Sequence, residues 1–343
     1  EQYAKDLKNE AELISKTKEM KANSIIKFNL SFILFMLLAC TVCSVGLAQD
    51  AEETMDKPAR KAVKNTFESV WLIDNQSVMV PIKGTFEFDI QHRFGTVKNG
   101  FEDLYGLFAP SNIRLGVSYV PVDNLNLGIG LTKSNMILDG SAKYAILKQT
   151  QDSWAMPVSL TYFGNLSYDL REDEDGTLYK NETDRLRFFN QLIIARKITD
   201  RFSVQVAPSI SWQNFVYGFY KVTGTDSSGY EIKEVANEMK HEHIAIAVGG
   251  RYKITESMSL IANYDQPITK HTANNPNPNI SFGFEFGTSG HAFQIFAGNY
   301  YYLNHQRNNI FNTNSPLEYK NVNNSTVKGG NFLIGFNITR LFN

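Results

Sequence analysis

The chain has 343 residues, with 34 lysine and arginine residues against 35 aspartate and glutamate residues, which gives a formal net charge of −1. This balance lacks the basic footprint of a nucleic-acid-binding protein, so no nucleic-acid partner is expected. The mean hydropathy of −0.27 resembles that of a soluble protein. A transmembrane β-barrel has such a value as well, because apolar and polar residues alternate within each span.

Residues 20–48 have the pattern of a secretory signal peptide. A short basic segment that starts at Met20 precedes a largely apolar stretch, and Gly46-Leu47-Ala48 supplies the small residues of a cleavage site. The alternative is an uncleaved transmembrane anchor, since the apolar stretch has about the minimum length of ~17–20 residues for one. Residues 1–19 precede a normal start methionine, and we interpret them as an upstream over-extension of the reading frame.

Both cysteines of the chain, Cys40 and Cys43, lie within this leader. A lipoprotein signal that ends at Cys40 is a further alternative, although Leu38 stands where a small residue is usual. With the leader removed, the chain has neither a disulfide framework nor thiol chemistry. An exported protein without cysteine fits a bacterial envelope better than an extracellular disulfide scaffold.

The next segment, residues 49–83, is expected to be a periplasmic leader or plug. Its first part is polar and charged. Residues 67–82 are mixed in character and form either a short hairpin that plugs or braces a barrel, or a packed leader.

From residue 84 to residue 343 the chain repeats one pattern, which its last stretch shows clearly. Between Phe332 and Phe342, large apolar residues alternate with small or polar ones. Successive side chains of a strand point to opposite faces, so this stretch is an amphipathic strand. The same pattern predicts twelve spans, at Thr85–Phe94, Asn112–Pro121, Asn124–Lys133, Ala142–Gln149, Ala155–Leu166, Arg187–Ile198, Arg201–Gln213, His243–Lys253, Ser257–Asp265, Ile280–Gly287, His291–Tyr300 and residues 329–343.

Short and long connections alternate between these spans. Tight turns are expected at Val122-Asp123, Gln151-Asp152, Thr199-Asp200, Thr255-Glu256 and Ser289-Gly290. This order is typical of outer-membrane barrels, which have short periplasmic turns and longer outer loops. The sequence therefore predicts an all-β protein: an antiparallel transmembrane β-barrel of about twelve strands in the cell outer membrane, with outer-membrane lipid around it and both termini in the periplasm.

Several stretches also resemble a known family. They are Gln91-His92-Arg93-Phe94-Gly95, the span from Asn112 to Pro121, Lys143-Tyr144 with Gln149, and Ile334 to Arg340. On these stretches the chain resembles an uncharacterised family of Gram-negative outer-membrane β-barrels, known as a domain of unknown function. The resemblance covers most of residues 67–343 and implies a barrel in the outer membrane, but no activity. The last strand, with Phe342 next to the end, also resembles the signal that the barrel-assembly machinery recognises.

In a transmembrane barrel the polar face of each strand points into the lumen. The alternation therefore predicts nine charged lumen-lining residues: Glu87, Asp89, Arg93, Arg114, Lys143, Arg187, Arg251, Asp265 and Glu285. Mixed charges suit a narrow channel or porin-like protein for small polar solutes. They equally suit salt bridges that fill a non-conducting barrel, whose outer loops bind a ligand or a partner.

Other chemistry has weak support in the sequence. His241 and His243 are expected to point the same way, but they lack further zinc ligands at useful spacing. The loop from Arg171 to Glu182 approaches a calcium-binding pattern, but Arg171 stands where the first carboxylate belongs. Ser289 and His291, the only candidates for a lipid hydrolase, lie in a tight turn without a positioned base. The sequence therefore predicts no enzyme, no cofactor and no metal.

Overall fold

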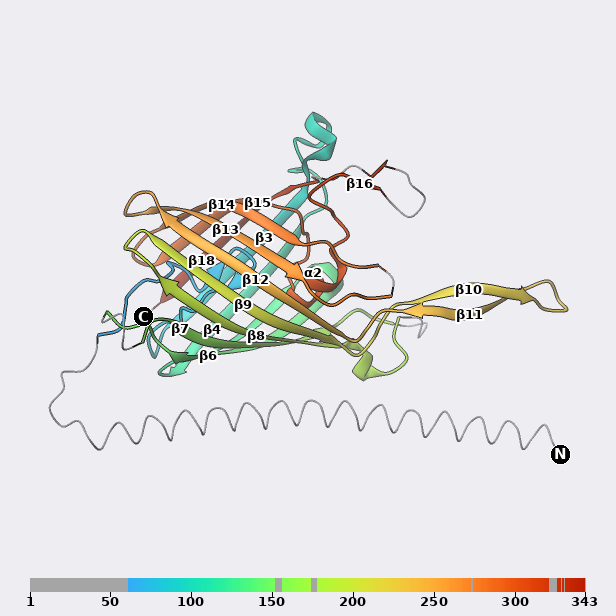
Figure 1. Cartoon of the computed structure of the whole chain (residues 1–343), viewed down its shortest axis with the longest axis horizontal. Helices are drawn as coiled ribbons and strands as arrows, with labels where there is room; N and C mark the ends of the chain where they lie inside the picture. Colours follow the sequence, from blue (N-terminus) through green and yellow to red (C-terminus); the bar gives the residue numbers. More distant parts are fainter. Residues whose placement is uncertain are drawn as a thin grey trace. The chain divides into compact units, whose positions relative to one another are not determined.

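Twelve antiparallel strands close into one barrel (Figure 1). They come from a computed structural model that describes residues 61–151, 156–173, 178–272, 274–320, 326–327, 329 and 331–342. The expected over-extension and signal peptide, and the first part of the polar lead-in, lie outside the described residues. Among the described residues, no helix is both long and apolar enough to cross a membrane.

The barrel strands are 8 to 12 residues long, close to the ~9–11 residues that a tilted transmembrane strand needs. They are β3 (Phe86–Thr96), β4 (Asn112–Val122), β5 (Leu125–Thr132), β6 (Ile137–Leu147), β7 (Ser159–Asp169), β8 (Leu186–Lys197), β9 (Phe202–Gln213), β12 (Glu242–Lys253), β13 (Met258–Pro267), β14 (Asn279–Gly287), β15 (His291–Gly298) and β18 (Leu333–Phe342). The predicted fold class, with twelve spans, is confirmed.

Pairing of the last strand with the first closes the ring. In β18, Phe342 lies opposite Phe86 of β3, and Phe336 lies opposite His92. Each remaining strand pairs with its neighbours in chain order, and β9 pairs directly with β12. Closure leaves no strand edge in lipid, where an unpaired backbone N–H or C=O group would be costly.

The two faces of the strands differ as period-two alternation requires. In β18, Leu333, Asn337 and Thr339 are buried, whereas Phe336 and Ile338 between them are partly exposed. Large apolar side chains on the outer face remain exposed in many strands, and they form the surface that contacts lipid.

The boundaries of β6 and β7 differ from the predicted ones. β6 begins at Ile137 and not at Ala142, and β7 begins at Ser159 and not at Ala155. The connection between them is therefore longer than the predicted tight turn at Gln151-Asp152, of which Asp152 lies outside the described residues. Part of this connection instead pairs with the segment that precedes the first barrel strand, because a β-bridge joins Thr150 to Ala62.

We call the end of the barrel where β3 begins and β18 ends the inner rim, and the opposite end the outer rim. The loops of the outer rim carry short elements that the sequence pattern did not predict: the 3₁₀ helices η1 (Val97–Asp103), η2 (Ser134–Met136) and η3 (Glu182–Arg185), and the hairpins β10–β11 (Gly218–Thr225 and Glu231–Glu238) and β16–β17 (Tyr319–Lys320 and Thr326–Val327). The β10–β11 hairpin extends away from the barrel along its axis (Figure 1).

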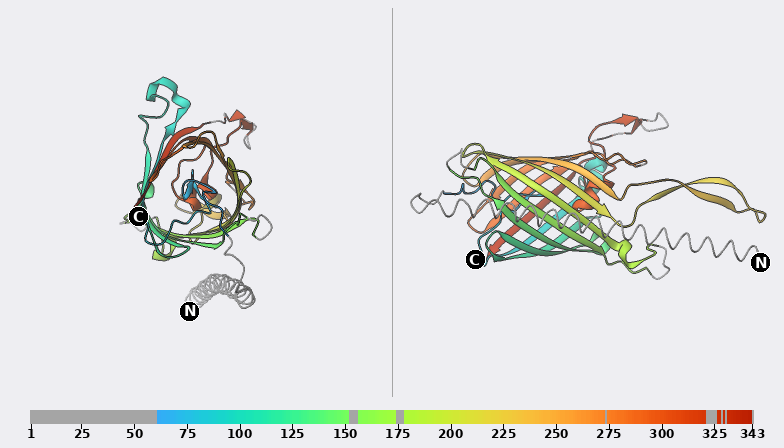
Figure 2. Two further views of the ribbon diagram at one scale, coloured as in Figure 1. Left: turned by 90° about the vertical axis from the view of Figure 1, so that its left-hand side faces the viewer. Right: turned by 60° about the horizontal axis from the view of Figure 1, so that its bottom comes forward.

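Two segments occupy the interior of the ring (Figure 2, left). One is a hairpin that precedes β3, made of β1 (Trp71–Leu72) and β2 (Asn75–Gln76). The other is the helix α2 (His305–Phe311), which belongs to the outer loop between β15 and β18. We call residues 61–83, which contain the hairpin, the inner segment. Of the alternatives for residues 67–82, the structure has the hairpin inside the barrel.

The turn of this hairpin is strained and held in place by the barrel wall. Ile73 has φ of 59°, a left-handed conformation that costs a β-branched residue roughly 1–3 kcal/mol. Its N–H donates to Oε1 of Gln294 in β15 at 3.2 Å, and its carbonyl accepts from Nδ2 of Asn337 in β18 at 2.7 Å. The side chain of Ile73 is fully buried. These contacts show that the hairpin is built into the barrel.

Candidate functional site

The structure buries all nine predicted lumen-lining residues. None has more than 7% of its surface exposed, in a barrel whose outer face is largely apolar. These residues are Glu87, Asp89, Arg93, Arg114, Lys143, Arg187, Arg251, Asp265 and Glu285. Their role in selecting a solute stays a prediction. Their contacts show which segments they hold inside the barrel.

Arg114 of β4 organises a buried cluster on the wall formed by β3 to β6. Its guanidinium donates to both carboxylate oxygens of Asp139, at 2.9 and 2.8 Å, and to Oδ1 of Asp89 at 2.9 Å. A bidentate contact between an arginine and a carboxylate, such as that of Arg114 with Asp139, is among the strongest charged hydrogen-bond contacts in proteins. The sequence analysis missed Asp139, because it placed the start of this strand five residues too late. The alternation of Asp139 with Ser141 and Lys143 could have found it.

Other charged wall residues hold the inner segment. Lys143 donates to the Val70 carbonyl at 3.2 Å and to Oε1 of Gln76 at 3.0 Å. Arg251 pairs with Glu68 at 2.9 Å and with Glu285 of the wall at 3.3 Å. In the same way, Asp265 accepts from Nδ2 of Asn75 at 2.8 Å. The lumen charges thus serve to fasten a segment inside the barrel.

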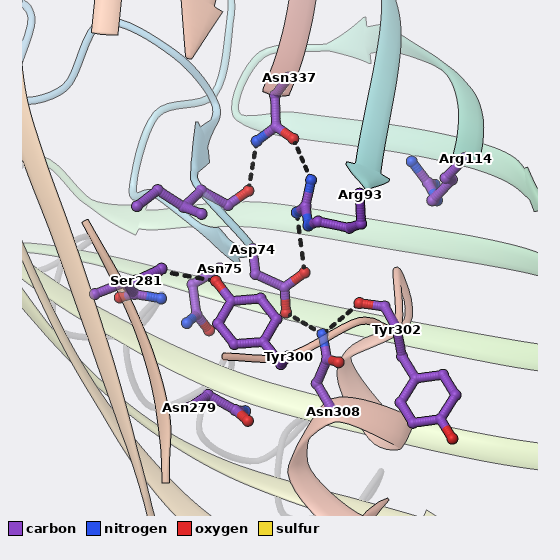
Figure 3. Close-up of polar contacts among 12 residues, drawn as sticks. Asp74, Asn75, Arg93, Arg114, Asn279, Ser281, Tyr300, Tyr302, Asn308 and Asn337 are labelled. Atoms are coloured by element: carbon purple, nitrogen blue, oxygen red, sulfur yellow. Dashed lines mark hydrogen bonds and ion pairs between the residues drawn. The ribbon is translucent and has the colours of Figure 1, made fainter. Parts of the chain in front are cut away.

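The inner segment and the outer helix meet at Asp74 in the middle of the lumen (Figure 3). One carboxylate oxygen of Asp74 faces the guanidinium of Arg93 at 3.6 Å, and the other accepts from Nδ2 of Asn308 in α2 at 2.7 Å. Arg93 also donates to Oδ1 of Asn337 at 2.9 Å. A segment from one rim and a helix from the other are therefore joined directly.

His305 of α2 adds an aromatic contact to this junction. Its ring stacks on Trp71 of the hairpin at 5.8 Å and on Phe189 of β8 at 4.9 Å, measured between ring centroids. Gln306 donates to Oδ1 of Asn165 in β7 at 2.9 Å. The helix was not predicted, because its buried residues are mostly polar and do not show the apolar stripe of an ordinary helix.

Part of the interior is apolar. Phe67, Leu72, Ile73 and Val78 of the inner segment pack in one buried cluster against inward-facing wall residues: Phe163, Phe189, Ile193, Ala195, Ala207, Ala247, Ile261 and Phe296. A water-filled pore would expose these wall side chains to water. On the inner face, these wall residues are covered by the apolar side chains of the inner segment.

The cavities beside the charged cluster around Arg114 are small. A cavity of about 30 Å³ lies beside Glu87, Arg114 and Lys143, and one of about 10 Å³ lies between Arg114, Trp71 and His305. A water molecule needs a cavity of roughly 10–15 Å³. The larger cavity therefore has room for about two water molecules and the smaller one for about one, and neither has room for a larger solute.

A larger cleft of about 540 Å³ opens at the outer rim. Tyr300, Tyr301, Tyr302 and Tyr319 contribute to its lining, together with Phe311 and several asparagines. Tyr300 is itself buried and donates to Oγ of Ser281 at 2.8 Å, so it does not belong to an aromatic girdle at the membrane surface.

The asparagines of this cleft stabilise its walls. Nδ2 of Asn299 donates to the Pro278 carbonyl, and Nδ2 of Asn314 donates to the Asn299 carbonyl, each at 2.9 Å. Asn312 donates to Oδ1 of Asn279 at 2.8 Å. Because these amides bond to the loops, the cleft is largely pre-formed.

The two predicted candidate histidines do not converge. His243 faces His271 at 3.0 Å, between Nδ1 and Nε2, whereas His241 stacks on Trp212. The expectation that both point one way is wrong, because β12 begins only at Glu242 and His241 lies outside its alternation. Burial, followed by the positive charge of Lys240, lowers the pKa of His271, and Nδ1 of this ring accepts from the Lys240 N–H.

In the calcium-like loop and at the Ser289–His291 turn, the described hydrogen bonds stabilise the local backbone. Asp173, in the calcium-like loop, accepts from the backbone N–H groups of Leu178 and Tyr179 at 2.9 and 2.8 Å. The central residues of that loop, 174–177, lie outside the described residues. At the inner rim, the N–H of His291 donates to Thr288, and no hydrogen bond joins Ser289 to His291 in this described turn. Across the described part of the chain, no group of three or more His, Cys, Asp or Glu side chains could hold a metal ion.

The chain belongs to a family of membrane-bound β-barrels. The model of the family described as "Membrane bound beta barrel domain (DUF5777)" matches residues 67–342. This membership confirms the predicted resemblance, and this closed antiparallel barrel lies in the outer membrane. A comparison with curated proteins gives no match.

Solved structures of similar shape have low sequence identity to the chain. An outer membrane channel from Pseudomonas putida F1 is 13% identical, with a TM-score of 0.38, over 77% of this chain and 97% of that one. The toluene transporter TodX of Pseudomonas putida is 9% identical, with a TM-score of 0.33, over 77% and 89%. The outer-membrane OmpT of Vibrio cholerae is 11% identical, with a TM-score of 0.28, over 77% and 99%. These likenesses carry no argument about function.

Proposed function

We propose that this protein is a sealed outer-membrane barrel that binds a ligand at its outer rim and does not conduct solutes. One observation carries the proposal: the inner segment and α2 meet inside the lumen, where Asn308 donates to Asp74. The barrel is therefore filled from both rims. This reading favours the binding alternative of the sequence analysis over the channel.

The energetics of the interior support a permanent seal. Withdrawing the inner segment would expose Phe67, Leu72, Ile73 and Val78 together with their apolar wall partners. Each such side chain gains about 1.5–3 kcal/mol from burial. Withdrawal of the inner segment would also break the ion pair between Arg251 and Glu68. A gate that opens often would not be fastened by so many contacts.

Bilayer conductance tests the seal. The purified full chain is expected to give no current steps above background in a planar lipid bilayer. A disulfide provides a matched control, because Oγ of Ser69 in the inner segment lies 3.5 Å from Oγ1 of Thr339 in β18. We expect the variant Ser69→Cys/Thr339→Cys, in a background without Cys40 and Cys43, to be equally silent when oxidised and when reduced. Steady current steps that disappear on oxidation would contradict the seal.

The cleft at the outer rim is the proposed binding site. Aromatic faces, hydroxyl and amide groups, and Lys98 as the one charged residue among its described lining residues suit a neutral, ring-bearing polar ligand such as an oligosaccharide. We expect Tyr301→Ala to weaken the binding of a neutral oligosaccharide several-fold, with maltoheptaose as the first probe in calorimetric titration. Tyr230→Ala, at the distant tip of the β10–β11 hairpin, should leave binding unchanged. Absence of binding to the wild type, or equal loss in both variants, would refute this ligand class.

A narrow channel for small polar solutes is the second candidate. The cavities beside Arg114 favour it, because they lie next to the charged cluster and both border Trp71 and Phe163. The conductance experiment separates the two candidates. No enzymatic activity is part of either proposal, and recognition of β18 by the assembly machinery stays a prediction.

A further inference from the structure

The loop between β3 and β4, residues 97–111, projects sideways from the barrel wall at the outer rim. The view along the barrel axis shows it reaching radially beyond the ring of strands (Figure 2, left). The β10–β11 hairpin, in contrast, extends parallel to the axis (Figure 1). A membrane surrounds the barrel, so a loop that extends radially at this rim lies over or within the lipid, whereas the axial hairpin leaves it.

The tip of this β3–β4 loop is apolar and exposed. Phe101 and Phe108 are 80% and 82% exposed, and Tyr105 is 50% exposed. Leu107 between them is exposed as well. Apart from an edge contact of Phe101 with Tyr105 at 6.4 Å between centroids, no ring contact of these three aromatic side chains occurs among the described residues. Bulky apolar groups in water are costly, and their clustering at one tip marks an interaction surface.

The loop is braced so that these side chains stay outside. Asp103 accepts from Nδ2 of Asn99 at 2.9 Å and from the Gly106 N–H at 2.8 Å. Leu104 and Tyr105 have positive φ of 51° and 57°, which is unusual for bulky residues. The hydrogen bonds of Asp103 hold the loop in this conformation. The backbone presents the rings away from the barrel.

A glycine pair fastens the base of the loop to β3. The Gly95 N–H donates to the Gly106 carbonyl at 3.0 Å. Gly106 has φ of +85°, and a Cβ atom placed there would lie 2.3 Å from the Gly95 carbonyl oxygen. Only glycine allows this close approach. The geometry of the base therefore sets the sideways direction of the loop.

The surface that the loop continues is the lipid-facing side of the barrel. Phe94 on the outer face of β3, and Ile113 and Leu115 on β4, are partly exposed near the base of this loop. We propose that the β3–β4 loop is a membrane anchor, with Phe101 and Phe108 inserted into the lipid at the outer surface of the bilayer. Aromatic side chains favour this interface. The anchor would fix the height and tilt of the barrel in the bilayer.

Spin labels at single cysteines test the anchor in the full chain. In a background with Cys40→Ser and Cys43→Ser, labels are attached to Phe101→Cys, Phe108→Cys, Leu115→Cys or Tyr230→Cys. Each variant is reconstituted in phosphatidylethanolamine–phosphatidylglycerol vesicles. Collisions with oxygen report lipid, and collisions with a water-soluble nickel chelate report water. Tyr230 is the matched control, since it is 75% exposed in the axial hairpin.

The labels at Phe101 and Phe108 are expected to resemble the label on lipid-facing Leu115. Their oxygen-to-nickel collision ratio should exceed that at Tyr230 several-fold. Ratios equal to that at Tyr230 would overturn the proposal. Shielding from both reagents would overturn it as well, since it would indicate a protein partner on the loop.

A glycine substitution tests the brace. Gly106→Ala should displace the loop and lower the oxygen-to-nickel ratio of the label at Phe101. Gly229→Ala is the control: Gly229 has the same φ of +85°, but a Cβ atom there meets nothing within 4 Å. It should leave the ratio unchanged. An unchanged ratio in Gly106→Ala would refute the role of the glycine pair. The difference in gel migration between boiled and unboiled protein checks that the barrel is folded.

Discussion

Replacing Arg114 with methionine is expected to lower the free energy of unfolding by about 3–5 kcal/mol, the usual cost of removing one partner from a buried ion pair. In the wild type, the Arg114 guanidinium lies 2.9 Å from the Asp89 carboxylate and 2.8 Å from the Asp139 carboxylate. The variant leaves both buried carboxylates without this positive partner. Methionine keeps an unbranched apolar side chain in place of the aliphatic stem of arginine, so the change removes mainly the guanidinium with its charge and hydrogen bonds. Urea-driven unfolding in lipid vesicles measures the difference.

Two controls separate this loss from general effects of removing an arginine. Arg196→Met, on the exposed face of β8, should change stability by no more than about 0.5 kcal/mol. Adding Asp89→Asn and Asp139→Asn to Arg114→Met removes the stranded charges and should restore part of the loss. A triple variant as unstable as the single one would show that the cluster does not contribute through its charges.

Much of the barrel could be predicted from the sequence, because the strand period is a local signal. Side chains such as Glu87 and Asp89 recur at every second position, and alternation alone places them on one face. The β10–β11 hairpin was missed because its strands do not keep a regular period-two pattern. It contains register irregularities between Phe219 and Tyr220 and between Val222 and Gly224, which interrupt the pattern.

What fills the barrel could not be predicted in the same way. Asp74 and Asn308 are 234 positions apart in the chain and meet only because the barrel closes around them. The apolar wall residues Phe163 and Ile193 look like irregularities of alternation until the inner segment is placed against them. Sequence reasoning could name the inner segment as a plug or a brace, but contacts between distant segments were needed to show that it fills the lumen.

The seal has a direct consequence for conductance. Deleting residues 61–83 is expected to convert a silent barrel into one that gives steady current steps in a planar bilayer. Eight strands are filled by wall side chains and sixteen leave an open channel, so about twelve strands leave a lumen that needs a separate filling. The deletion also removes Asp74 and Trp71, the hairpin contacts of α2, although Gln306 still bonds to Asn165.

A deletion of equal length outside the lumen is the matched control. Removing residues 216–238, which contain the β10–β11 hairpin, should leave the barrel silent, since this hairpin extends from the outer rim (Figure 1). Both variants should still migrate differently on gels before and after boiling, as folded barrels do. If the barrel without residues 61–83 is folded and still silent, α2 and the charged wall seal the lumen by themselves. The inner segment would then be a brace, because its apolar contacts would stabilise the wall without being needed to block a path.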